Sequence, residues 1–286
     1  MDDHAPRIAA HRSAFRALHE KGCFVIPNPW DVGSARYLRH LGFKALATTS
    51  SGYAFSRGLP DGTAAVSLED ALAHFTELAR ECDLPLNADF QSGYADAPEG
   101  VAANVRRCVA TGVSGLSIED SIRADGRSLY DLGLARERVR AAREAIDASG
   151  TGVMLTARAE CFLVGHPDPL AESIRRLQAY AEEGADVLYA PGPPRREDIQ
   201  AIVSAVAPRP VNVLVSSNVG LTVADLAALG ARRISVGSGL AAMAWTGFIT
   251  AARTIAEEGR FTGFEGKFPS SDLNAFFEKD ARERLG

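Results

Sequence analysis

The sequence predicts a closed (β/α)8 barrel, an α/β fold in which eight parallel strands are each followed by a helix. Short apolar runs alternate with helix-length amphipathic segments, which is the pattern of parallel strands joined by helices. A phrase of Gly, an apolar run and a polar or Gly-rich end recurs at every second run, which favours closure. The length of 286 residues also compares well with the roughly 250 typical of one such barrel. The recurring phrases occupy 41–50, 111–120, 183–192 and 229–238.

The eight strands are expected where the apolar runs are bounded by Gly or polar residues. They are predicted at 24–27, 45–48, 84–89, through Leu116 and Ile118 in 111–121, at 153–157, in 183–190, in 209–216 and in 229–238. An open doubly wound sheet is the alternative. That fold usually shows a glycine-rich dinucleotide turn after its first strand, and the segment 27–30 (PNPW) is not such a turn.

Amphipathic segments between these runs predict the helices, and Thr222 is expected to cap the helix that follows it. Two segments, 48–62 and 121–132, are predicted as long loops, which on barrels often carry function although a solvated loop is an equal alternative. The tail is rich in Phe and is predicted as an extra helix. We expect one domain over 1–286, with 259–286 as a C-terminal helical extension. The helices are expected at 11–22, 34–41, 67–82, 99–111, 135–148, 168–183, 223–229 and 241–258.

Composition and charge exclude several classes of function. A net charge of −5 and a pI near 5.7 predict no nucleic-acid partner and no anionic-membrane partner. The arginine pairs at 106–107, 175–176, 195–196 and 232–233 are interpreted as solvated faces. No apolar stretch approaches the ~20 residues of a membrane span. Because the first residues also lack an apolar signal core, a soluble cytoplasmic protein is expected.

Cysteine and histidine spacing gives no metal motif. The four cysteines stand far apart without a CxxC pair, and the six histidines show no HExxH spacing. Free thiols are therefore expected rather than a zinc site or disulfides.

Charged side chains stand where three predicted strands end. In a barrel, Asp89, Glu119 and Arg158 meet at one face, whatever their separation in sequence. Asn87 lies two residues before Asp89, on the same side of its strand. These oxygen ligands are those preferred by Mg²⁺ or Mn²⁺, and the planar arginine fork suits a substrate carboxylate or phosphonate.

Such a site suits an enolate. The backbone N–H groups of 50–52 (SSG) could face a developing oxyanion. A divalent ion and an arginine would stabilise the enolate shared by reactions of 2-oxo and 2-hydroxy acids. The alternative is that Glu119 and Arg158 form only a structural ion pair at the barrel rim.

Four motifs, in order, resemble one known family. They are TTSSGYAFSRGLPDG (48–62), NADFQSGY (87–94), GLSIEDS (115–121) and TARAE (156–160). With these, the chain resembles the isocitrate lyase and phosphoenolpyruvate mutase superfamily from 27 to 245. The resemblance implies a (β/α)8 barrel with its last helix swapped between subunits of a dimer-of-dimers homotetramer. It also implies a Mg²⁺-dependent enzyme acting on a small 2-oxo or 2-hydroxy dicarboxylate through an enolate.

The resemblance also assigns roles by position. Asp89 and Glu119 correspond to metal-shell carboxylates, and Asn87 stands where many members have a third acid. Asp61 corresponds to a loop acid near metal and substrate, and Arg158 to the substrate-binding arginine. The residues that correspond to the loop holding the substrate carboxylate are Thr49, Ser50 and Ser51.

Departures from the family pattern bear on the reaction. The loop 121–132 has no Cys, Lys or His where the lyases carry a catalytic cysteine and the mutases a lysine. The end of strand six, 190–192 (APG), lacks the His or Glu of those branches. We therefore expect a carbon–carbon lyase, by retro-aldol cleavage or decarboxylation, whose general acid lies elsewhere. The candidates are Tyr53, Tyr94, Asp125, Tyr130 and Glu160.

Three alternatives stay open from the sequence. One is phosphonopyruvate hydrolysis or mutation, against which the missing lysine argues. Another is a catalytically degenerate barrel that binds an oxo acid without turnover, suggested by Asn87. The third is a phosphate-binding barrel of another family, based on the segment 237–239 (GSG) after strand eight.

Overall fold

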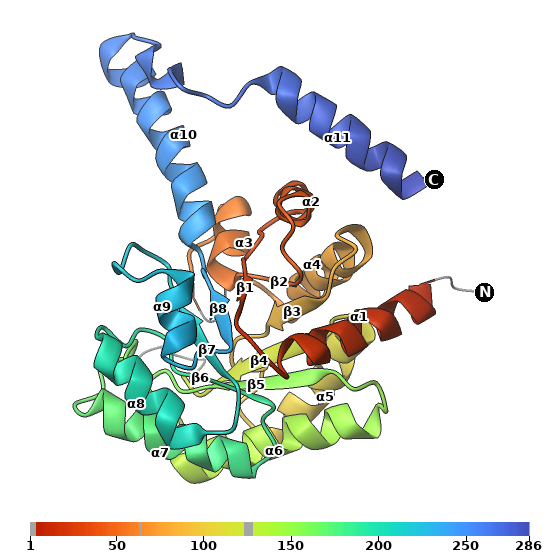
Figure 1. The fold of residues 1–286 in the computed structure, drawn as a ribbon, viewed down its shortest axis with the longest axis vertical. Coiled ribbons are helices and arrows are strands. Elements are labelled where there is room, and N and C mark those ends of the chain that lie inside the picture. Colours follow the sequence, from red (N-terminus) through yellow and green to blue (C-terminus); the bar gives the residue numbers. More distant parts are fainter. Residues whose placement is uncertain (1–3, 63–64, 123–127, 286) are drawn as a thin grey trace. The chain divides into compact units, whose positions relative to one another are not determined.

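The computed structural model describes residues 4–62, 65–122 and 128–285. Eight parallel strands form one sheet in the order β1-β8-β7-β6-β5-β4-β3-β2. The backbone N–H of Ala47 in β2 donates to the carbonyl of Pro27, just after β1, at 3.1 Å. The sheet is thus nearly closed, with helices around it (Figure 1), and the predicted (β/α)8 barrel is confirmed.

The strands are short, between two and five residues each. They are β1 Phe24–Ile26, β2 Leu46–Ala47, β3 Leu86–Asp89, β4 Gly115–Glu119, β5 Met154–Arg158, β6 Val187–Tyr189, β7 Val211–Leu214 and β8 Arg233–Ser235. The helices of the described part are α1 His4–Leu18, α2 Val32–His40, α3 Ser50–Ser56, α4 Leu68–Glu81, α5 Pro98–Ala110, α6 Leu132–Ala148, α7 Pro169–Glu182, α8 Arg196–Val206, α9 Val223–Ala228, α10 Gly239–Glu258 and α11 Ser270–Leu285.

Local capping explains where several helices begin. The Asp31 carboxylate accepts from Ser34 N at 2.7 Å, and the Ser34 hydroxyl accepts from Asp31 N at 3.2 Å. This reciprocal capping box starts α2. The Thr222 hydroxyl accepts from Asp225 N at 3.2 Å and starts α9, as predicted.

The segment 48–62 is not only a loop, and the loop prediction for it is wrong in part. Thr49 caps the short helix α3, because its hydroxyl accepts from Gly52 N at 3.2 Å. In the second predicted loop, 121–132, Ser121 bridges to Leu129. Asp125 lies outside the described residues.

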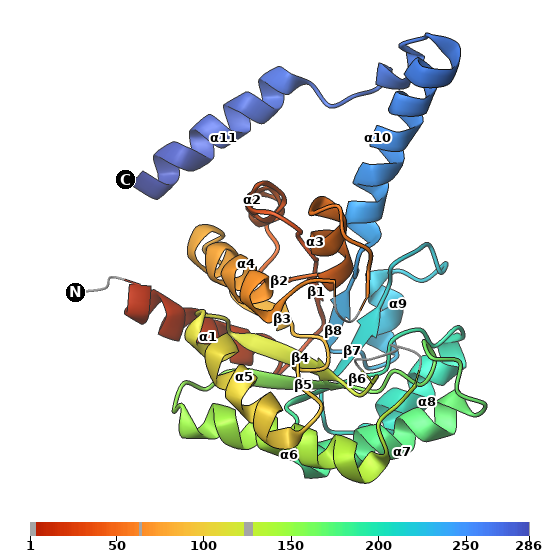
Figure 2. The same cartoon turned by 180° about the vertical axis from the view of Figure 1, so that it is seen from behind.

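Helix α1 covers the amino-terminal end of the barrel. Arg12 donates to the carbonyl of Val109 in α5 (2.9 Å) and to that of Val113, just before β4 (3.0 Å). The Phe15 side chain is fully buried, and a Cβ added at Gly115 would lie 2.7 Å from its ring. The N-terminal end is therefore filled by packing, and Figure 2 shows α1 beside the strands from behind.

The chain separates into two compact units, Met1–Gly239 and Leu240–Gly286. The second unit holds most of α10, a 3-10 turn at Thr262–Phe264, and α11. Exchange of the last helix between subunits stays a prediction. In the described ranges, no helix combines the length and apolar character needed to cross a membrane.

Candidate active site

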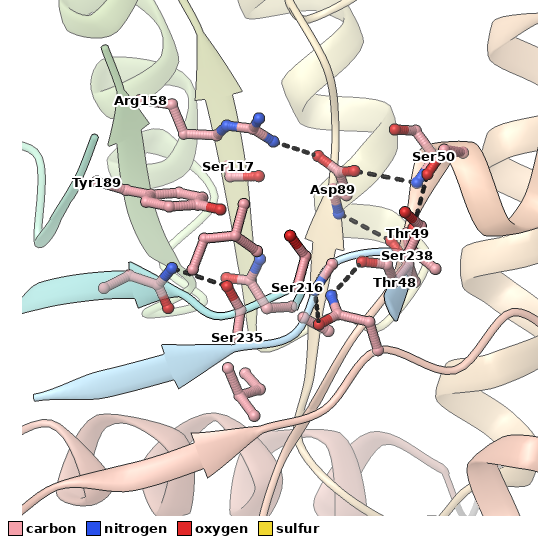
Figure 3. Close-up of a pocket in the computed structure, with 18 of the residues that line it drawn as sticks. Thr48, Thr49, Ser50, Asp89, Ser117, Arg158, Tyr189, Ser216, Ser235 and Ser238 are labelled. Atoms are coloured by element: carbon pink, nitrogen blue, oxygen red, sulfur yellow. Dashed lines mark hydrogen bonds and ion pairs between the residues drawn. The ribbon is translucent and has the colours of Figure 1, made fainter. Parts of the chain in front are cut away.

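The carboxyl ends of β3, β4 and β5 bring three charged side chains together. Each of Asp89, Glu119 and Arg158 is the last residue of its strand, and Glu119 pairs in register with Arg158. Arg158 Nη1 lies 2.9 Å from Asp89 Oδ1, and Nη2 lies 3.4 Å from Glu119 Oε2. Figure 3 shows Arg158 pointing at Asp89 across the pocket. The juxtaposition expected from the strand ends is present.

A third carboxylate completes the surroundings of Arg158. Its Nε donates to Glu160 Oε1 at 2.8 Å, and its guanidinium carbon lies 5.0 Å from the centre of the Tyr189 ring. Burial disfavours the charge of Arg158, but Glu160, Glu119 and Asp89 outweigh it and raise the pKa of Arg158 above its ordinary value. The ion pair considered as a structural alternative therefore exists, within a larger cluster that holds the guanidinium in place.

Two carboxylates of this cluster hold protons more tightly than usual. Burial, with the nearby charge of Asp89, raises the pKa of Glu119, and Arg158 opposes the shift. Burial, with the charge of Glu119, raises the pKa of Glu160 to about 8. Only about 5% of the Glu160 side chain is exposed, so desolvation is the physical cause.

The predicted oxyanion cradle is partly engaged by the protein itself. Ser50 N donates to Asp89 Oδ2 at 3.0 Å, and Gly52 N donates to the Thr49 hydroxyl. Thr48 fixes the same strand end, because its hydroxyl accepts from Asp89 N at 2.8 Å. Thr49, Ser50 and Ser51 all line the cavity, as does Asp89. This loop therefore both orients Asp89 and faces the cavity.

Asn87 has an acceptor atom without a partner. Its side chain lines the cavity and is 3% exposed, and its Nδ2 donates to the carbonyl of Ala88 at 3.2 Å. Its buried Oδ1 has no hydrogen-bond partner in the described part of the chain. Within the same ranges, no group of three His, Cys, Asp or Glu residues is arranged to hold a metal ion. Two carboxylates and one orphaned amide oxygen fit a divalent ion only as an incomplete shell that a ligand would finish.

Asp61 lies at the exposed mouth of the cavity. Partial desolvation and the charge of Asp89 raise its pKa, and Arg158 opposes them. Asp61 therefore lies close enough to Asp89 and Arg158 for both charges to affect its pKa.

The cavity encloses about 200 Å³ and contains residues that sequence reasoning missed. They are polar side chains inside apolar strands or just after them. A polar residue at such a position is a signal by which they could have been identified as cavity residues. Arg176 and Arg233 are buried (5% and 3% exposed), so reading them as parts of solvated faces was wrong. The missed lining residues are Asn28, Ser117, Tyr189, Asn212, Ser216, Arg233 and Ser235, while Gly237 and Ser238 of the weighed segment 237–239 also line the cavity.

The four described candidates for the general acid do not line this cavity. Tyr130 hydrogen-bonds to Asp96, Glu160 bonds to Arg158, and Tyr53 stacks on His74. Tyr94 and Tyr53 border a smaller void behind the Thr48–Ser50 turn. Asp61 and Tyr189 are instead titratable side chains that do line this cavity.

Comparison with known proteins agrees with this geometry. The phosphoenolpyruvate phosphomutase family model matches residues 15–256. The 2-methylisocitrate lyase of Escherichia coli K12 is 30% identical over 182 residues, which cover 62% of this chain and 60% of that protein.

Two solved structures are similar over nearly the whole chain. A structure from Burkholderia cenocepacia J2315, assigned provisionally as a lyase or mutase, is 43% identical with a TM-score of 0.90, and the match covers 96% of this chain and 97% of that one. An oxaloacetate acetylhydrolase bound to its product oxalate is 28% identical with a TM-score of 0.84, and 96% of each chain is covered. Together with the motifs and the barrel, these matches show that the chain belongs to the phosphoenolpyruvate mutase/isocitrate lyase superfamily.

Proposed function

We propose that this protein is a lyase that cleaves a carbon–carbon bond of a small 2-oxo or 2-hydroxy dicarboxylate through an enolate. Retro-aldol cleavage and decarboxylation are the two forms of this reaction. The cluster that Arg158 forms with Asp89 and Glu119 carries the proposal. Asp89 and Arg158 line the cavity, whereas Glu119 contacts Arg158 without lining it. Similarity to a methylisocitrate lyase and to an oxaloacetate acetylhydrolase supports it, since both names describe enzymes of small oxo or hydroxy acids.

The protein's own groups account for binding and orientation. Arg158 offers a rigid fork of N–H donors to a carboxylate, and Glu160 and Tyr189 hold that fork in place. Thr49, Ser50 and Ser51 line the opposite side of the cavity. A bound acid would thus be held between the α3 turn and β5.

A divalent ion, Mg²⁺ or Mn²⁺, would be held by Asp89, Glu119 and the orphaned Oδ1 of Asn87. When bound, it would supply positive charge that stabilises an enolate. Asn87 contributes no charge, so the shell depends on a carboxylate-rich ligand more than a three-acid shell would.

Asp61, at the cavity wall, is the group suited to deliver the proton. Desolvation and the charge of Asp89 raise its pKa, toward the operating pH that suits a general acid. Burial raises the pKa of Tyr189 to about 12, which suits that phenol to donate a hydrogen bond rather than to give up its proton.

The assembly is a homo-oligomer, a dimer of dimers in which the last helix is exchanged between subunits. Exposed apolar side chains on α10, including Met243 and Phe248, support this, because a large apolar surface exposed to water usually marks an interface with another protein chain.

The test is a panel of four- to six-carbon oxo and hydroxy diacids, with products followed by mass spectrometry. Turnover is expected with added Mg²⁺ or Mn²⁺ and is expected to cease with EDTA. Glu119→Gln and Arg158→Lys should each lower kcat/KM by roughly 100-fold or more, as loss of electrostatic stabilisation does. Glu182→Gln and Arg175→Met, on the exposed surface of α7, are the matched controls.

Normal rates in folded Glu119→Gln or Arg158→Lys would contradict the assigned site. Ligand-dependent thermal stabilisation without product would instead identify a binding protein. Because the matching family model carries the name of a phosphomutase, phosphonopyruvate belongs in the panel, and phosphate release from it would favour carbon–phosphorus chemistry.

A further inference from the structure

A second guanidinium lies inside the barrel, on the floor of the same cavity. Arg233 is the first residue of β8 and is 3% exposed. Its Nε donates to Asn212 Oδ1 at 2.8 Å, and its Nη2 donates to the Thr156 hydroxyl at 3.1 Å. Its Nη1 lies 3.5 Å from His19 Nε2. Among the residues the structure describes, no carboxylate pairs with Arg233.

His19 does not balance or add to this charge. Its Nδ1 lies 2.8 Å from the carbonyl oxygen of Phe15, which can only accept, so Nδ1 carries the proton. Nε2 is then the acceptor that faces Arg233. Burial and the charge of Arg233 lower the pKa of His19 to about 3, so the imidazole is neutral at neutral pH.

The two arginines of the cavity therefore differ in charge balance. Arg158 is surrounded by three carboxylates, whereas the partners of Arg233 are neutral. Burial lowers the pKa of Arg233 to about 10, which still leaves it protonated at neutral pH. A guanidinium also has more N–H donors than these three contacts use. The floor of the cavity thus holds an uncompensated positive charge.

Polar groups surround this charge on the cavity side. The Asn212 amide, which binds Arg233, also donates to the Ser235 hydroxyl at 2.9 Å, and Ser235 is close enough to Tyr189 to affect the pKa of its phenol. Figure 3 shows the Tyr189 ring between Arg158 and Ser235. All five side chains line one cavity. A ligand in it would meet a different cation at each end.

We propose that Arg233, Asn212, Ser235 and Tyr189 form a second anion-binding subsite, which holds the substrate carboxylate remote from the reacting carbon. The inference rests on the proposed function for its choice of a diacid. It explains why a buried charge with no counter-ion lies below the reaction centre, because such a charge is costly unless an anion approaches it. Arg233 is then a specificity residue that favours diacids over monoacids.

Calorimetric titration with malonate and succinate, compared with the monoacid pyruvate, tests this without requiring turnover. Asn212→Asp is nearly isosteric and gives Arg233 a permanent counter-ion, while Ser235 can donate to the new carboxylate. We expect diacid affinity to fall by roughly tenfold or more, the effect of losing one charge-assisted contact, and pyruvate affinity to change little. Arg233→Lys keeps the charge and should retain part of the diacid preference.

Arg232→Met is the matched control, since Arg232 donates to the carbonyl of Gly22 at 2.7 Å and does not line the cavity. Folding of each variant is checked by circular dichroism. Undiminished diacid affinity in folded Asn212→Asp would overturn the subsite, as would a parent protein that binds no diacid. Loss of diacid binding in that variant, with no turnover of any acid by the parent, would uphold the subsite and refute the proposed function.

Discussion

One ring nitrogen of the buried His74 side chain makes no hydrogen bond in the described part of the chain. The ring stacks on Tyr53 with 4.0 Å between centroids, and its buried Nε2 has no hydrogen-bond partner within the described ranges. Burial is the main cause that lowers the pKa of His74 to about 4. In the unfolded chain a histidine has a pKa of about 6.5. At mildly acidic pH the unfolded state therefore binds a proton at this residue, whereas the folded state does not.

His74→Phe should therefore stabilise the fold in acid. A depressed pKa contributes stability above about pH 6.5, which is lost as pH falls toward about 4. Between about pH 7 and pH 5 the parent should lose roughly 1–2 kcal/mol through this group, and the variant should not. Denaturant unfolding at the two pH values measures this. An identical pH dependence in parent and variant would show that His74 does not titrate as its burial implies.

At the residue scale, sequence reasoning located charges at strand ends better than charges inside the barrel. Asp89, Glu119 and Arg158 each end a short apolar run, so their common face followed from strand geometry alone. Arg233 is the first residue of β8 and Arg232 comes just before it, so their side chains point to opposite sides. The amino-acid sequence does not show which of the two side chains faces water. Only the closed barrel shows that Arg233 is the buried one.

At the element scale, the alternation of strands and helices was predictable, and the exceptions have local causes. Helix α3 starts with a Ser-Ser-Gly sequence, which is unfavourable in a helix interior, and depends on the Thr49 cap. Helix α8 was not predicted as an element. The helix comes after the Gly- and Pro-rich segment 191–194, and its N-cap residue is Arg195, whose side chain makes no capping hydrogen bond. The Ser, Thr, Asp or Asn that usually marks the start of a helix is therefore missing.

Gly115 in β4 is a position where the packing of strand and helix leaves no room for a side chain. An added Cβ would lie 2.7 Å from both the Phe15 ring and Asn87 Oδ1. Gly115→Ala should therefore lower the free energy of unfolding by ~1–3 kcal/mol, the usual cost of overpacking a core. Thermal and denaturant unfolding measure it. Gly62→Ala, where an added Cβ meets nothing within 4 Å, is the control, and equal stabilities for the two variants would contradict the packing.

At the scale of the whole molecule, the repeated pattern predicted the barrel, because each strand and helix is covered by neighbours in the same chain. Helix α10 differs from the earlier helices in how little of it is buried. The residues of α10 are all described, and of these only Ala241 is buried, although the helix is largely apolar. A helix that is apolar on most sides is normally covered. The sequence alone cannot say which chain covers it.

Oligomer formation through α10 is therefore the last prediction. Met243 and Phe248 are 68% and 63% exposed, and burying them between subunits would remove apolar surface from water. Light scattering after size exclusion should report a tetramer for the parent and a smaller species for Met243→Glu/Phe248→Glu. Leu41→Glu, at a comparably exposed site beyond α2, should leave the tetramer intact. A monomeric parent, or a tetramer unaffected by the double variant, would mean that α10 is covered in some other way, since two glutamates in an apolar interface cannot be accommodated without loss of affinity.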